Sequence, residues 1–105
     1  MIHTYPDTNE NLIKLESNVH LIDERLQRLT TLDKLSSQLV FSDITKAQKY
    51  LAEILEIFAE YDHPDIRLNY HLNTALVENQ LCNYNLSEIH FRLALEILGE
   101  RGDVN

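Results

Sequence analysis

Apolar residues recur at helical spacing along most of the chain, and little of it has the two-residue alternation of a strand. The first apolar stripe follows a heptad pattern over nearly three heptads. A new apolar phase begins at Leu32, so the pattern fits one long helix to about Val40 or a helix broken at Thr30-Thr31. Threonine is only weakly unfavourable in helices, so both remain open. The stripe consists of Leu12, Leu15, Val19, Ile22, Leu26 and Leu29.

Three more helices are predicted after this stripe. Asp43 follows a turn and is placed to cap the first of them. Pro64 disfavours helix at the residue before it, and Asp65 is expected to cap the next. The last helix is expected to open at Asn85 or Ser87. The pattern therefore predicts an all-α chain, with these helices at about residues 44–61, 66–81 and 85–100.

The stretch 83–105 repeats the stretch 43–65 at a distance of 40 positions. Leu-Glu-Ile occurs at 55–57 and again at 95–97. Such a repeat indicates an array of one small structural unit. We therefore expect one domain, made of a leading amphipathic helix at 1–25 and two helical hairpins at 26–65 and 66–105.

The second hairpin carries Ala75 in its first helix, Tyr84 after the turn, and Ser87-x3-Phe91-x2-Ala94 in its second helix. This pattern resembles the tetratricopeptide repeat (TPR) family, in its branch with longer links. The resemblance implies a right-handed α-α superhelix in which small residues let helices cross closely and Phe91 fills the next gap. The sequence departs from the family pattern at Leu35, Thr74 and Glu78.

The resemblance also implies a concave face, lined by the first helix of each hairpin, that grips an extended peptide or a partner helix. Asparagine amides there can bond a peptide backbone, and leucines can hold an apolar side chain. Alternatively, Leu72 and Leu76 are core residues against the first hairpin. The expected partner groove consists of Asn69, Leu72, Leu76, Asn79 and Gln80.

The heptad stripe offers a second surface. It can fold back on the first hairpin, or it can pair with another copy of the chain. Three heptads are short for a free-standing coiled coil, but joined to a domain they can form a symmetric dimer. We therefore expect a homodimer as one alternative.

The charge of the chain bears on its partners. Seventeen acids and nine bases give a net charge of −8 over 105 residues, and the bases are scattered among acids. Nucleic acid and anionic membranes, which attract basic surfaces, are therefore not expected partners. The start resembles no signal peptide and no apolar run could span a bilayer, so a cytoplasmic protein is expected.

No pattern of catalytic or metal-binding residues is apparent. The five histidines lack the spacing of a metal site, and there is no phosphate-binding loop or nucleophile motif. The single cysteine, Cys82, excludes an intrachain disulfide and is expected to be a small buried filler. We expect no enzyme activity, no cofactor and no bound metal.

These features together favour a protein–protein interaction or dimerisation module. The last predicted helix has apolar residues on more than one side, whereas repeat arrays normally finish with a polar face. We therefore expect the chain to be the N-terminal regulatory part of a longer signalling protein. The alternative is a small autonomous acidic adaptor or chaperone that binds a client peptide or helix.

Overall fold

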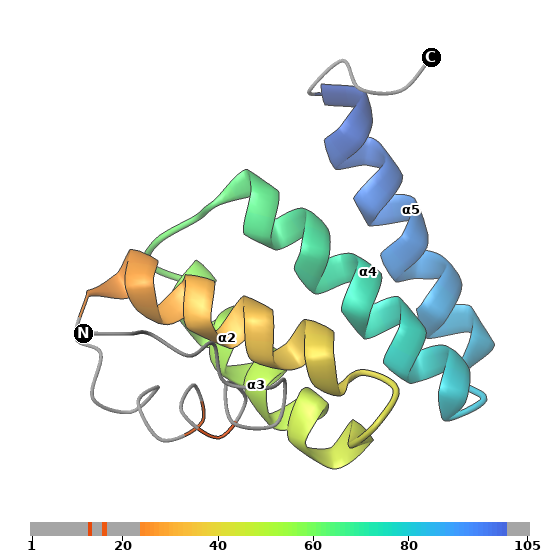
Figure 1. Ribbon diagram of the computed structural model, residues 1–105. Coiled ribbons are helices and arrows are strands. Elements are labelled where there is room, and N and C mark those ends of the chain that lie inside the picture. Colours follow the sequence, from red (N-terminus) through yellow and green to blue (C-terminus); the bar gives the residue numbers. More distant parts are fainter. Residues whose placement is uncertain (1–12, 14–15, 17–23, 101–105) are drawn as a thin grey trace, which may run out of the picture.

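The computed structural model describes Ile13, Glu16 and residues 24–100. Ile13 and Glu16 have helical conformation, and the described part of the chain contains no strand. The all-α prediction is thus confirmed. Within residues 24–100, four helices follow one another with short connections (Figure 1): α2 (Arg25–Leu39), α3 (Ile44–Phe58), α4 (Pro64–Gln80) and α5 (Tyr84–Glu100).

Neither alternative for the leading helix is correct: the chain is not one long helix up to Val40, and the helix is not broken at Thr30-Thr31. Glu24 has extended backbone, with φ −70° and ψ 127°, and α2 begins directly after it. The two threonines lie inside α2, where the Thr30 hydroxyl donates to the Leu26 carbonyl oxygen at 2.9 Å. The interruption therefore falls six residues earlier than a threonine pair would suggest.

The N-terminal cap of α3 was predicted correctly from the sequence, and that of α4 was not. The Asp43 carboxylate accepts a hydrogen bond from the Lys46 amide, as expected. At α4 the cap is His63, whose Nδ1 accepts from the Ile66 amide at 3.3 Å, so the expectation of Asp65 is wrong. Pro64 takes the first turn, where no amide donor is needed, and Asp65 follows inside that turn.

The turn between α4 and α5 is a Schellman motif. The Cys82 amide donates to the Asn79 carbonyl oxygen, and the Asn83 amide donates to that of Glu78. Cys82 has φ 64°, the left-handed conformation that favours glycine. Cys82 is exposed, which corrects the expectation of a buried filler. Its place in the repeat is therefore set by backbone geometry.

The core lies between α2, α3 and α4. Its largest side chains come from one face of each helix, and amides of α4 add polar ties to α2. Asn73 donates to the Ser37 hydroxyl at 2.9 Å, and Gln80 donates to the Val40 carbonyl oxygen at 2.7 Å. The buried cluster comprises Leu29, Leu32, Leu35, Leu39, Val40, Ala47, Tyr50, Leu51, Ile54, Ile66, Tyr70 and Val77.

Among the described helices, α5 contacts α4 alone. Small residues form the crossing: Ala75 and Ala94 are buried, and the Ser87 hydroxyl donates to the Ala75 carbonyl oxygen at 2.8 Å. The expectation that small residues permit this close approach is confirmed. Phe91 remains 38% exposed, so the expectation that its ring fills a gap between helices is wrong.

Candidate functional site

Helix α5 carries apolar side chains on several sides, but only one of these sides is buried. Its buried residues, Ser87, Ala94 and Ile97, face α4. At about 100° per residue, apolar side chains continue round the helix on both sides of this stripe. One side, the outer flank, carries Tyr84, Phe91 and Leu95; the other, the inner flank, carries Leu86, Ile89 and Leu93.

Five of these six side chains are exposed, and the sixth, Leu93, is half-buried. Leu95, for example, is 58% exposed. Apolar sides of a helix are normally buried against neighbouring elements. Within the described part of the chain, α5 therefore lacks neighbours for two of its three apolar sides.

A groove lies between α3 and α4. It encloses a volume of about 220 Å³, several times the roughly 30 Å³ that a water molecule occupies in the liquid. Leu55 contributes an aliphatic wall and is 53% exposed. The residues that line this α3–α4 groove are Gln48, Leu51, Ala52, Leu55, Tyr70, Thr74, Val77 and Glu78.

The inner flank of α5 faces the same side of α4 as the groove. The ring of His90 on α5 packs edge-on to that of Tyr70, with centroids 6.2 Å apart, and Tyr70 lines the groove. In that direction His90 is followed round the helix by Ile97, Leu86, Leu93 and Ile89. The groove and the inner flank thus face the same side of the molecule, and α4 lies between them.

Two histidines meet at the α4–α5 contact. The Nδ1 atoms of His71 and His90 are 3.0 Å apart. A hydrogen bond between them requires that one ring carries its proton at Nδ1 and the other does not. Burial lowers the pKa of His71 to about 4, and the charges of His90 and Arg67 act in the same direction. Burial also lowers the pKa of His90, against the opposing charge of Glu78.

We expect this pair to make the fold sensitive to mild acid. A histidine whose folded pKa lies below the ordinary 6.5 binds protons more readily when unfolded, so its contribution is complete above pH 6.5 and is lost as the pH falls towards 4. The shift corresponds to about 3 kcal/mol at most, and discounting for partial exposure leaves about 1–2 kcal/mol. Urea unfolding at several pH values should show this loss, and His71→Gln should reduce it.

Asp33 contributes a pH dependence of the opposite sign, which that experiment must take into account. Burial raises the pKa of Asp33, against the lowering effect of its hydrogen bond from Asn69, so its protonation stabilises the fold in acid. This opposite effect is present in both proteins and cancels in the comparison. Equal pH dependence of wild type and His71→Gln would contradict the assignment to the histidine pair.

The expected partner groove is only partly available. The Asn69 amide donates to the Asp33 carboxylate at 3.2 Å, and Gln80 is bonded to α2 as described above. Leu76 packs against the core, as the alternative interpretation held, and Leu72 is half-buried. Asn79 is exposed. The structure thus uses two of the three amides within the chain.

The expected dimer stripe is described only at its end. Leu12, Leu15, Val19 and Ile22 lie outside the described residues. Leu26 is exposed, whereas Leu29 is completely buried in the core, so Leu29 has no surface to offer a second copy. This corrects the expectation for Leu29, because the register of α2 turns it towards the core.

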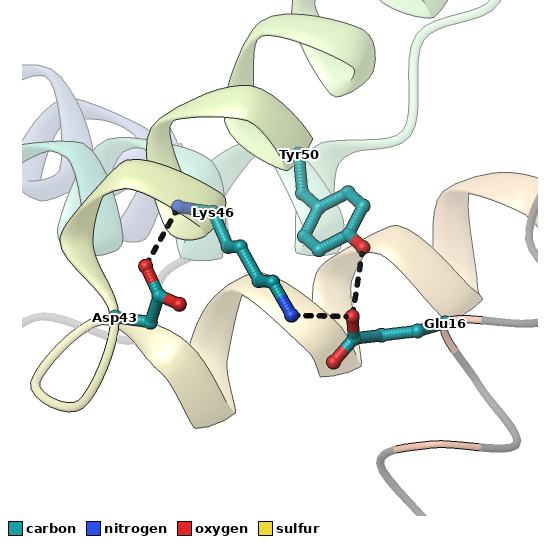
Figure 2. A network of polar contacts seen from close by, with 4 residues as sticks. All are labelled: Glu16, Asp43, Lys46 and Tyr50. Atoms are coloured by element: carbon teal, nitrogen blue, oxygen red, sulfur yellow. Dashed lines mark hydrogen bonds and ion pairs between the residues drawn. The ribbon is translucent and has the colours of Figure 1, made fainter.

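A polar network ties Glu16 to α3. The Glu16 carboxylate lies 2.9 Å from the Lys46 ammonium group and 3.5 Å from the Tyr50 hydroxyl, which donates to it (Figure 2). The hydrogen bond and charge of Glu16 raise the pKa of Lys46. Burial raises the pKa of Tyr50, and the Glu16 charge adds to this. The network positions this part of the leading segment against the first turns of α3.

Other kinds of site find no support among the described residues. They contain no group of three or more histidine, cysteine or acidic side chains placed to hold a metal ion. None of their helices is long and apolar enough to cross a bilayer.

No protein-family model, curated protein or solved structure matches this chain. Leu55 and Ile89 were not among the site residues expected from the sequence. The repeat held a signal for Leu55, because it occupies the same place as Leu95 in the recurring Leu-Glu-Ile, and both are more than half exposed.

Proposed function

We propose that the chain is a protein–protein interaction module whose binding surface is centred on α5. The observation that carries this proposal is that α5 has apolar side chains on three sides and, among the helices that the structure describes, packs on α4 alone. Large exposed apolar patches on water-facing proteins are characteristic of interaction sites. The partner is a protein or peptide, or a second copy of this chain.

The proposal includes a TPR-like architecture. Three features support it: the helices form two pairs, α4 packs against both α2 and α3, and α4 and α5 cross at the small residues Ala75 and Ser87. Under the same proposal, the chain is a regulatory part of a longer cytoplasmic signalling protein. Reading the gene past the codon for Asn105 tests that extension separately from the interaction itself.

Photo-crosslinking in the source cells tests the interaction. A photoreactive phenylalanine analogue is placed at Leu95 on the outer flank, at Ile89 on the inner flank, and at Gln27 on α2 as the control. All three positions are exposed, so the fold should tolerate the change. We expect discrete protein adducts from α5 and none from Gln27.

The mass of the adduct separates the partners. An adduct of twice the chain mass identifies a second copy, and any other discrete mass identifies a different protein. If Leu95 and Ile89 give no more adduct than Gln27 in folded protein, the interaction function is wrong.

A further inference from the structure

We propose that the α3–α4 groove, together with the inner flank of α5, holds an amphipathic helix whose polar edges are basic. This inference rests on the proposed function and names the class of partner. It uses the charges that surround this surface, which the proposed function does not use.

The shape of the surface suits a helix. Leu55 on α3 and Ile89 on α5 are both exposed, and α4 lies between their helices (Figure 1). The floor between them contains Val77 and the ring of Tyr70. A helix bound in this way would place apolar side chains at spacings of three and four residues into the groove, as helix-in-groove complexes do.

The charges on the α5 side of this surface are nearly all negative, whereas α3 also carries the exposed cation Lys49, and Arg67 on α4 pairs with Asp62 at 3.1 Å. From Glu78 to Glu100 the chain has four glutamates and one base, Arg92. Arg92 already pairs with Glu88 at 2.6 Å. No cation is paired with Glu78 in the described part of the chain; its carboxylate accepts from the Asn83 amide and it lines the groove.

The remaining glutamates of α5 lie on the inner flank. Glu96 follows Leu93 by three positions, and Glu100 follows it by seven, so all three share one face of the helix. Both glutamates are exposed. Glu56, also exposed, is next to Leu55 on the opposite wall. A partner helix in the groove would therefore meet three carboxylates on its α4–α5 side, whereas on its α3 side Glu56 shares a helix face with the exposed Lys49, seven positions earlier.

This charge pattern selects the partner. An acidic or uncharged helix would gain only apolar burial, whereas lysine or arginine on its edges would meet the carboxylates. Such complementarity contributes specificity and speeds association, and it weakens as salt is added. The outer flank has no comparable excess, because Glu88 and Arg92, which lie beside it, neutralise one another.

Two designed peptides test the inference by fluorescence anisotropy on the full chain. Both are amphipathic helices with the same leucine face; one has lysine on its polar edges and its twin has glutamate. We expect the lysine peptide to bind at least about tenfold more tightly than its twin at low salt, and the difference to shrink as salt is raised.

Three variants locate the binding. Ala52→Arg places a bulky cation in the groove from an exposed position and should weaken binding of the lysine peptide by about tenfold or more. Gln27→Arg adds the same charge on α2, outside the groove lining, and should have little effect. The triple variant Glu78→Gln, Glu96→Gln and Glu100→Gln keeps the shape and should remove the preference for lysine.

Each other outcome overturns the inference. Equal binding of the two peptides refutes the basic partner. Binding that survives Ala52→Arg but is lost in Leu95→Arg moves the site to the outer flank. If neither peptide binds, the inference is wrong, and the crosslinking at Leu95 and Ile89 then decides independently whether the interaction function stands.

Discussion

Leu35→Ala should lower the free energy of unfolding by about 3 kcal/mol. Leu35 is completely buried between the helices of the core. Truncation removes its apolar contacts and leaves a cavity, and buried leucine-to-alanine changes cost about 2–5 kcal/mol. Urea denaturation followed by circular dichroism measures the difference.

The same substitution is informative about the TPR resemblance. In the repeat, Leu35 occupies the place of Ala75, where the family pattern has a small residue. A rule based on that pattern would predict that alanine is tolerated. The control is Leu55→Ala, which makes the same chemical change at a half-exposed site and should cost about 0.5 kcal/mol or less. Similar losses in the two variants would show that the burial of Leu35 is wrong.

The periodicity of the chain was sufficient to predict the helices but not every boundary. The caps show why. Asp43 is a strong capping residue after a turn and was predicted, whereas His63 caps α4 through a ring nitrogen, which no common rule anticipates. The extended backbone at Glu24 has no glycine or proline beside it to mark it.

The surfaces were harder to predict than the helices. A hydrophobic stripe says which side of a helix is apolar, but not how many neighbours the helix has. Leu51 and Leu55 share one stripe of α3 and both line the groove, yet Leu51 is 5% exposed and Leu55 is 53% exposed. Similarly, Asn69 and Gln80 were candidates for binding a peptide, and their donors are used by α2. Tertiary packing decides these cases.

The attachment of α5 is the second feature on which a large effect depends. Ala75 is completely buried where α4 and α5 cross, and its carbonyl oxygen accepts a hydrogen bond from the Ser87 hydroxyl. Ala75→Leu would add three carbons at a contact that has no space for them. Overpacking of this kind costs about 1–3 kcal/mol, and we expect the upper part of that range because the Ser87 hydrogen bond would also be strained.

The expected loss should be local, because α5 is held by α4 alone among the described helices. Hydrogen exchange in Ala75→Leu should accelerate across α5, while the amides of α2 and α3 keep their protection. Ala52→Leu, the same change at an exposed position, should leave both unchanged. Uniform acceleration in all four helices would mean that α5 unfolds only with the core. In that case its exposed flanks belong to one cooperative unit, and a partner bound there would stabilise the whole chain.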